Sequence, residues 1–412
     1  CTMKYNPKIN EDTARLPGFS MLHPYASSED SQGALELIYN LEASLTEISG
    51  MDHITLQAAA GAQGELCGML MLAAYFKDKG EKRTKVIIPD TAHGTNPASC
   101  ALAGFDVIRV ASGKDGVVSV DAIEKVLDEI NEDVAAIMLT NPNTLGLFEV
   151  NIKEISELVH AKGGFVYCDG ANLNALMGIT KLSLMGVDIV QFNLHKTFST
   201  PHGGGGPGSG PLGVTKELEP FLPGPRVIKE GDGYALEHNR PKSIGRMKAF
   251  YGNFSIMVRA YTYILMMGGD GLKQVSEMAI LNANYIKEKL KDTFELAYDE
   301  PCMHECVFTD KWQNEFGVTT LDIAKRLIDF GVHPPTIYFP LVVDGAIMVE
   351  PTETESLETI DSFISAMKAI AKEAKENPDK LKSAPHTAAC GRVDEVLAAR
   401  EPILRWEAKG PS

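Results

Sequence analysis

The chain has 412 residues, of which 44% are hydrophobic and 23% are charged, and its formal net charge is −16. The length suffices for two domains and a large core, and the proportions are ordinary for a globular protein. The negative charge and the lack of a basic stripe argue against a nucleic-acid partner. No apolar run approaches the length of a membrane span, which argues against a membrane-spanning protein.

The seven cysteines are an odd number in a long chain, which indicates reduced thiols and predicts a cytoplasmic protein. Residues 302–306 contain two of them together with His304 and Glu305, a composition that a metal cluster would also show. No second pair of ligands lies near this segment in the sequence, so we expect a strand there and no metal site. The chain opens at Cys1 without a targeting segment, and we expect the protein's true start to lie upstream.

The first half of the chain alternates short apolar runs with helical patterns. Residues 1–30 contain three prolines and are expected to be irregular, whereas apolar residues recur at helical spacing over 31–50. The alternation that follows predicts an α/β fold with a mostly parallel sheet covered by helices. We expect strands at 85–89, 106–111, 135–140, 165–169, 188–194 and 211–214, and helices that include 66–77, 120–130 and 152–161.

The second half predicts a smaller α+β domain. A helix over 254–267 ends at Gly268-Gly269, and a second helix follows over 272–290. After these we expect strands at 295–298, 305–309, 338–343 and 346–350, and helices at 320–330 and 355–375. The expected organisation is an N-terminal arm (1–30), a large domain (31–253), connecting helices (254–290), a small C-terminal domain (291–376) and a C-terminal tail (377–412).

Lys196 lies between the predicted strand 188–194 and the glycine-rich stretch Gly203-Gly-Gly-Gly-Pro-Gly-Ser-Gly210. A lysine at the end of a buried strand is costly unless it is paired or neutralised. An amine that its site keeps partly deprotonated can bind an aldehyde cofactor through an imine. The alternative is a lysine whose ammonium simply extends from the strand end into solvent.

Asp169 ends the apolar strand 165–169, and one helix and one strand fit between it and Lys196. In a parallel sheet both residues would lie at the carboxyl edge, where ligands bind. A lysine and an acid there suit pyridoxal phosphate, since the lysine holds the aldehyde and the acid keeps the ring nitrogen protonated. The alternative is that Asp169 caps the next helix.

A stretch of small residues, 58–64, precedes the predicted helix 66–77. Small residues at the start of a helix leave backbone N–H groups and the positive end of the helix dipole accessible, which suits a phosphate. Such turns are common, and the motif gains weight from its position upstream of Asp169 and Lys196.

Four stretches make the chain resemble the glycine decarboxylase family, the P-proteins of the glycine cleavage system, which are fold-type I pyridoxal-phosphate enzymes. The stretches are Cys1-Thr-Met-Lys-Tyr-Asn-Pro-Lys8, Ala60-Gly-Ala-Gln-Gly-Glu65, Ala92-His-Gly-Thr-Asn-Pro-Ala-Ser99, and His195-Lys-Thr-Phe198 with the glycine-rich block that follows it. The resemblance is to the second subunit of the two-chain form and extends over nearly the whole chain. It implies a large pyridoxal-phosphate-binding domain at 31–253.

The resemblance also implies roles for individual residues. Lys196 would bind the cofactor covalently, Asp169 would pair with the pyridinium nitrogen, and His93 would stack on the ring; these three would be catalytic. Ala171 would contact the other ring face, and His195 would neighbour the phosphate or the ring. Thr144, or equally Asn141, would lie near the phenolic oxygen. Three consecutive residues would bind the phosphate: Gly61, Ala62 and Gln63.

The implied reaction is decarboxylation of glycine with transfer of the aminomethyl group to the lipoyl arm of H-protein and release of CO2. The implied partners are P-protein subunit 1, in an α2β2 heterotetramer, and lipoylated H-protein, with no nucleic acid and no membrane.

Three alternatives remain open. A cysteine desulfurase would need a cysteine in an active-site loop, and an aminotransferase would need an arginine such as Arg240 or Arg392 for the substrate carboxylate. A non-catalytic scaffold subunit is the third, and the presence of Lys196, Asp169 and the small-residue stretch argues against it.

Overall fold

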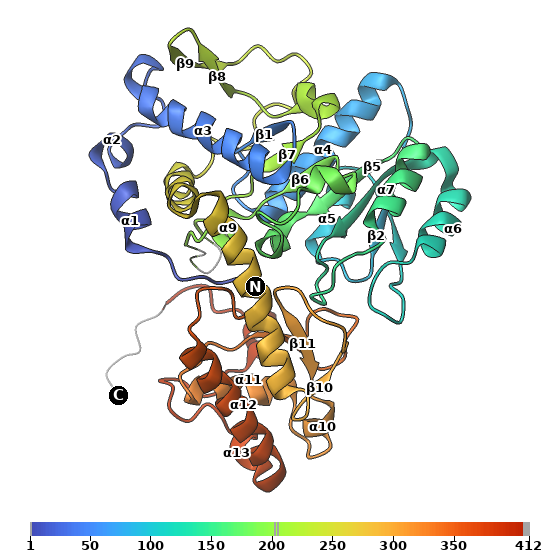
Figure 1. Ribbon diagram of the computed structural model, residues 1–412, viewed down its shortest axis with the longest axis vertical. Coiled ribbons are helices and arrows are strands. Elements are labelled where there is room, and N and C mark those ends of the chain that lie inside the picture. Colours follow the sequence, from blue (N-terminus) through green and yellow to red (C-terminus); the bar gives the residue numbers. More distant parts are fainter. Residues whose placement is uncertain (1, 202, 204–205, 407–412) are drawn as a thin grey trace.

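The computed structural model describes residues 2–201, 203 and 206–406. Its two larger sheets are joined by a long helix, and a third sheet has only two strands (Figure 1). The larger sheet has seven strands in the order β1-β7-β6-β5-β4-β2-β3. Strands β3, β2, β4, β5 and β6 are parallel, and β7 runs antiparallel to both of its neighbours. The strands are β1 (His53–Thr55), β2 (Lys85–Pro89), β3 (Asp106–Val110), β4 (Val134–Thr140), β5 (Phe165–Asp169), β6 (Ile189–Gln191) and β7 (Leu212–Val214).

Helices cover both faces of this sheet, which confirms the predicted α/β fold. Every residue of β4 and β5 is buried, as expected of parallel strands that are covered on both faces. Within β4, Ile137 and Leu139 belong to one apolar core, whereas Ala136 and Met138 belong to the other. The first core also takes side chains from α3 (Gln32–Ser49), α6 (Val120–Ile130) and α7 (Ile152–Ala161), and the second from α4 (Gly61–Lys79) and α5 (Thr95–Leu102).

The smaller sheet is antiparallel, has the order β10-β11-β13-β12, and packs with two helices around its own core. Its elements are β10 (Glu295–Leu296), β11 (Cys306–Thr309), β12 (Thr336–Ile337), β13 (Ala346–Val349), α11 (Thr320–Asp329) and α12 (Leu357–Glu376). Helix α9 (Phe254–Leu290), drawn in yellow and orange, runs from the larger sheet to the smaller one (Figure 1). It contacts α1 and α3 as well as α12 and β11.

Helix α9 is interrupted at Gly268, where φ is 60° and ψ is −176°. The break lies where the sequence predicts that one helix ends, and glycine is the residue that adopts such a conformation without strain. The domain boundaries themselves stay a prediction. None of the described helices is long and apolar enough to cross a membrane.

Three expectations differ from the structure. The strand predicted at 338–343 is wrong, because Tyr338 has a left-handed φ of 56° and Pro340 has no N–H to donate. The strand predicted at 188–194 ends at Gln191, since the chain then turns into the short helix α8 (Leu194–Thr197). The N-terminal arm is not irregular throughout: it contains α1 (Lys8–Ala14) and α2 (Pro17–Ser20). Prolines are tolerated at such helix starts, where an N–H has no intrahelical acceptor.

The sequence does not predict β1, α5 or the hairpin of β8 (Arg226–Glu230) and β9 (Gly233–Glu237). The remaining described helices are short: α10 (Lys311–Asn314), α13 (Pro378–Lys382), α14 (Glu395–Arg400), and the 3-10 helices Glu29–Ser31, Asn131–Asp133, Gly170–Ala175, Leu182–Met185 and Lys216–Phe221.

Candidate active site

A cavity of about 570 Å³ lies where the carboxyl ends of β4, β5 and β6 face the smaller sheet. Of the nine residues predicted to bind a cofactor, all but Gln63 line it: Gly61, Ala62, His93, Thr144, Asp169, Ala171, His195 and Lys196. The structure therefore brings together residues that lie far apart in the sequence. Their individual roles stay predictions.

Lys196 is half-buried on α8, directly after β6, and its backbone N–H donates to the carbonyl of Asn193 at 3.0 Å. The N-terminal arm holds this segment, because the ammonium of Lys4 donates to the carbonyl of Thr197 at 2.9 Å. Lys4 also forms a 2.8 Å ion pair with Glu353, and the side chains of the two are 0% and 9% exposed. Sequence reasoning missed Lys4, although it lies in one of the four stretches that carry the family resemblance.

Asp169 is buried at the end of β5, and three donors hold its carboxylate. The backbone N–H of Ala171 donates to Oδ1 at 2.9 Å, the amide of Gln191 donates to the same oxygen, and the amide of Asn96 donates to Oδ2 at 3.3 Å. The first bond caps the 3-10 helix Gly170–Ala175, so the capping alternative holds as well. A carboxylate fixed in this way cannot rotate to follow a neighbour, which suits a partner in a fixed position.

Helix α4 begins at Gly61, five residues earlier than predicted, and Ala60 gives it no side-chain cap. The first N–H groups of an α-helix have no intrahelical acceptor, so those of Gly61, Ala62 and Gln63 are free for an anion. The side chain of Gln63 does not reach the cavity. Its oxygen accepts from the N–H of Ala59 at 2.7 Å, and its amide donates to the carbonyl of Met247 at 3.0 Å.

Glycines allow the segment around Lys196 to pack against the start of α4. A Cβ at Gly210 would lie 2.1 Å from the carbonyl oxygen of Ala60, and one at Gly61 would lie 2.6 Å from the amide nitrogen of Asn193. Neither contact is sterically possible. The glycine-rich stretch therefore brings the predicted phosphate site next to α8; Gly204 and Gly205 lie outside the described residues.

His93 lies in the loop before α5, and its ring contacts the edge of Phe339 with 5.6 Å between the ring centroids. Its Nδ1 lies 2.8 Å from the hydroxyl of Thr95, which donates to Glu65 at 2.9 Å. The hydroxyl of Ser99 donates to the same carboxyl group at 3.4 Å. Burial, and then the charge of Asp169, raise the pKa of Glu65 to about 7. Sequence reasoning missed Glu65, and the available signal was an acid within a small and apolar helical run.

Thr144 is buried in the cavity wall, and its hydroxyl donates to the carbonyl of Thr91. The alternative residue, Asn141, does not line the cavity, and its side-chain oxygen accepts from the N–H of Glu149 at 3.0 Å. His195 is half-buried, and its Nδ1 accepts from the N–H of Ser209 at 3.3 Å. Thr144 is therefore better placed than Asn141 for the predicted contact.

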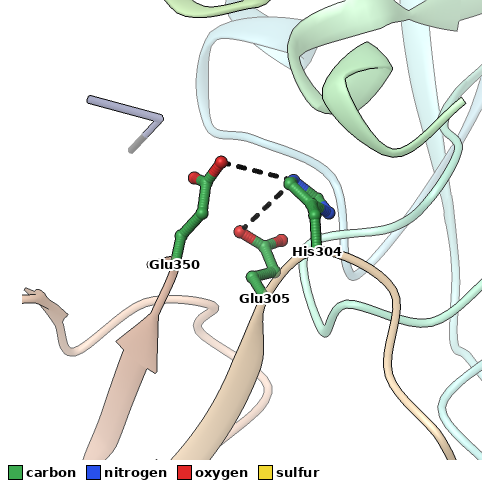
Figure 2. Close-up of side chains that lie close together, drawn as sticks. All are labelled: His304, Glu305 and Glu350. Atoms are coloured by element: carbon green, nitrogen blue, oxygen red, sulfur yellow. Dashed lines mark ion pairs between the residues drawn. The ribbon is translucent and has the colours of Figure 1, made fainter. Parts of the chain in front are cut away.

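The smaller sheet contributes the opposite wall of the cavity, which the sequence does not predict. Thr336, Phe339 and Met348 line it together with two carboxylates, Glu305 and Glu350. Both carboxylates face the ring of His304, as Figure 2 shows. The strand expected over 302–306 is therefore wrong except at Cys306, where β11 begins, and Glu305 of this segment lines the cavity.

Comparisons with known proteins identify the family. A family model described as the C-terminal domain of glycine dehydrogenase matches residues 275–387, and one described as beta-eliminating lyase matches residues 26–209. A protein of Caldanaerobacter subterraneus named probable glycine dehydrogenase (decarboxylating) subunit 2 is 60% identical over 98% of this chain and 83% of its own length. A protein of Halalkalibacterium halodurans with the same name is 59% identical over 99% of this chain and 83% of its own length.

The chain belongs to the glycine dehydrogenase (decarboxylating) subunit 2 family. Solved structures agree on the fold. An inhibitor-bound glycine decarboxylase (P-protein) has a TM-score of 0.76 at 19% identity, covering 90% of this chain and 84% of that one. A cysteine desulfurase from Thermococcus onnurineus has a TM-score of 0.68 at 16% identity, covering 89% and 92%. The architecture of this subunit 2 family member is thus that of fold-type I pyridoxal-phosphate enzymes, as the resemblance implies.

Pyridoxal 5′-phosphate is the cofactor of this family, and the cavity of the subunit 2 chain fits it. The free N–H groups of α4 suit the phosphate, and Asp169 suits a protonated ring nitrogen. Five buried oxygens of residues that line the cavity lack a hydrogen-bond partner among the described residues: Thr2 Oγ1, Thr140 Oγ1, Gln191 Oε1, Asn193 Oδ1 and Glu350 Oε1. Buried polar atoms of this kind are usually paired, so they indicate a polar occupant.

Proposed function

We propose that this chain is the cofactor-bearing subunit of a two-chain glycine decarboxylase. It decarboxylates glycine and passes the aminomethyl group to the lipoyl arm of H-protein. The observation that supports this most directly is that Lys196, Asp169 and the free N–H groups of α4 share one cavity. Membership of the subunit 2 family supports the choice of glycine as the substrate.

The chain's own residues divide the work of holding and protecting the reacting groups. The amine of Lys196 holds the cofactor aldehyde, and the N–H groups of Gly61, Ala62 and Gln63 bind its phosphate. When bound, pyridoxal phosphate supplies an electron sink that accepts the electron pair left by the departing CO2. Asp169, held by its three donors, keeps the proton on the ring nitrogen in place. His93 covers the ring, and its Thr95 and Glu65 contacts fix the loop that carries it.

The alternatives from the sequence find little support in the cavity. None of the described cysteines lines it, so no thiol is placed for desulfurase chemistry. Arg240 pairs with Glu219 and Glu237, and Arg392 pairs with Asp322, so neither of these two arginines is available for a substrate carboxylate. A scaffold without chemistry would have no need of a buried acid held opposite a lysine.

The assembly follows from the same proposal. Subunit 2 of the enzyme packs with subunit 1, and the α2β2 heterotetramer accepts the lipoyl arm of H-protein. Copurification with subunit 1 and a mass of two copies of each chain would support this arrangement. A chain that is monomeric and fully active alone would contradict it.

Borohydride reduction with peptide mapping tests the cofactor site, and glycine–bicarbonate exchange with H-protein tests the reaction. We expect a visible absorbance band that reduction removes, a pyridoxyl label on Lys196, and exchange of the glycine carboxylate with bicarbonate. A label on any other lysine would refute the assigned site. A correctly labelled protein that exchanges no carboxylate, with both subunits and H-protein present, would refute the reaction.

A further inference from the structure

His304, Glu305 and Glu350 form a cluster. Glu305 and Glu350 line the cavity that Lys196 also lines, and the buried ring of His304, which is not among the lining residues, lies against both carboxylates. Glu305 directly precedes β11 and Glu350 directly follows β13, and the antiparallel register that pairs Cys306 with Val349 puts the two acids opposite each other. The nitrogen Nε2 of His304 lies 3.9 Å from Glu305 Oε2 and 3.8 Å from Glu350 Oε1 (Figure 2). Like charges on directly opposed strand positions are unfavourable, so the arrangement calls for a compensating group.

The cluster is buried and its hydrogen-bonding capacity is not used. The side chain of His304 is 0% exposed, and those of Glu305 and Glu350 are each 3% exposed. Within the described part of the chain, neither ring nitrogen of His304 makes a hydrogen bond, and Glu350 Oε1 accepts none. Glu305 has one donor, the amide of Asn172, which lies 3.3 Å from Oε1. Buried polar groups are rarely left without partners, so an unpaired histidine between two acids indicates a ligand that donates.

All three side chains are acceptors. Burial lowers the pKa of His304, so its ring is neutral and one nitrogen carries a lone pair. Burial, and then the charge of Glu350, raise the pKa of Glu305 well above its usual range, so the protonated form of Glu305 is favoured while no cation is bound. A bound cation with N–H donors would compensate the negative charge of both carboxylates, so Glu305 would no longer need to be protonated. The cluster therefore has the chemistry of an ammonium site or of a metal site.

The spacing and the surrounding charges favour the ammonium. Ligands of a tetrahedral zinc ion lie about 3.4 Å apart, because each is about 2.1 Å from the metal. Acceptors of an ammonium lie up to about 4.7 Å apart, because each N–H···acceptor distance is about 2.9 Å. Nε2 of His304 lies 3.8 and 3.9 Å from the two carboxylate oxygens, and one ligand atom from each of the three residues lies within 4.8 Å of the others. A divalent ion would also place two positive charges beside Lys196, whose charge already acts on His304 and Glu305.

We propose that His304, Glu305 and Glu350 bind the amino group of the incoming amino acid as an ammonium and take one proton from it. This inference rests on the proposed function, since it needs glycine to enter this cavity. Glycine arrives as an ammonium, which has no lone pair with which to attack the aldehyde. One N–H bond breaks, its electron pair stays on nitrogen, and the proton goes to the carboxylate of Glu350, which becomes a carboxylic acid. The cluster thus selects a primary amine and converts it to a nucleophile at the cavity wall.

A competition experiment on the wild-type holoenzyme tests the site without a substitution. Glycine is titrated through the absorbance change of the bound cofactor, in ammonium chloride or in tetramethylammonium chloride at the same ionic strength. The ammonium ion offers N–H donors and is expected to raise the apparent Kd for glycine at least threefold, whereas tetramethylammonium offers none and is expected to leave it unchanged. Equal competition by both salts, or by neither, would overturn the proposal.

Substitution then assigns the residues. Glu350→Gln keeps the shape and removes the charge, and it is expected to raise the Kd for glycine at least tenfold while the cofactor band is retained. Glu149→Gln is the matched control, since Glu149 is also a buried carboxylate with a raised pKa but does not line the cavity; its Kd should stay within twofold of wild type. A Glu350→Gln holoenzyme with an unchanged Kd for glycine would refute the assignment.

Metal analysis distinguishes an ammonium site from a metal site in this cluster. Wild-type protein is expected to contain no stoichiometric divalent metal. One equivalent of metal that is lost in Glu350→Gln would show a metal site instead and overturn the amine assignment. Wild-type exchange activity with an unaltered Kd in Glu350→Gln would leave the proposed function intact while this inference fails, so the two are distinguishable.

Discussion

The two walls of the cavity differ in how completely their charged groups are paired. On the wall from the larger sheet, Asp169 accepts from three donors and Glu65 from two hydroxyls. On the wall from the smaller sheet, Glu350 Oε1 has no hydrogen-bond partner among the described residues, and neither have the ring nitrogens of His304 behind it. Groups that are already paired hold a fixed position, whereas unpaired acceptors are available to a ligand that comes and goes. The first wall therefore suits a resident cofactor, and the second suits a substrate.

The largest effect is expected on the first wall, at Lys196. Lys196→Ala should abolish the visible cofactor band and reduce exchange by at least about 10⁴-fold, because the residue acts as part of one catalytic unit. Absorbance spectra and glycine–bicarbonate exchange measure both. Lys162→Ala, at a lysine that lies outside the cavity, is the control and should behave like wild type. Turnover that survives in Lys196→Ala would remove the lysine from the mechanism.

Asp169→Asn is expected to separate cofactor binding from chemistry. The amide keeps the shape but cannot offer a negative charge to the ring nitrogen, so exchange should fall by about 10³-fold. Cofactor should still bind, since Lys196 and the start of α4 are untouched. Cofactor content and exchange rate are measured on the same preparation. A variant with the wild-type rate would show that the charge of Asp169 does not influence the ring nitrogen of the cofactor.

Lys4→Met tests whether the two walls depend on the arm that ties them together. The substitution leaves the carboxylate of Glu353 buried without its partner, and loss of one partner of a buried ion pair costs about 3–5 kcal/mol of unfolding free energy. Denaturant unfolding measures this. The double variant Lys4→Met/Glu353→Gln should recover part of the loss. A single variant as stable as wild type would mean that the pair contributes nothing to stability.

Glu65→Gln is expected to change the pH dependence of stability. The pKa of Glu65 is raised from 4.5 to about 7, so the folded protein holds a proton there that the unfolded chain has released. Wild type should therefore lose up to about 3 kcal/mol relative to the variant as the pH rises from 4.5 to 7, with little further change outside that window. Unfolding curves at several pH values measure the difference. Parallel pH profiles for the two proteins would contradict a raised pKa.

The sequence predicts the larger sheet better than the smaller one, and the reason is periodicity. Strands such as β4 and β5 are continuous apolar runs, which only a doubly covered parallel sheet explains. The apolar run at 338–343 looks the same in sequence, but a left-handed residue and a proline make it a loop. A local pattern of apolar residues does not predict such constraints on the backbone.

The residues of the candidate site that belong to the larger sheet are likewise easier to predict than those that come from elsewhere. Asp169 and Lys196 are predictable because Asp169 ends an apolar strand and Lys196 follows one closely, and the topology of a parallel sheet brings strand ends together. Glu350, which lines the cavity, and Lys4, which holds α8, are not predictable in this way, because their places depend on contacts between regions far apart in the sequence. The hydroxyls that bind Glu65 likewise come from a helix that the sequence does not predict.

The arm that holds α8 also bears on how the protein is made. Lys4 contacts the carbonyl of Thr197 and the carboxylate of Glu353, which both lie far downstream of it in the sequence. Domains generally fold as units while the ribosome extends the chain, and contacts between distant residues form only when both partners have emerged. Lys4 therefore stays without its ion-pair partner until Glu353 has been translated. The contacts that hold the segment of Lys196 are therefore complete only after all strands of the larger sheet have been synthesised.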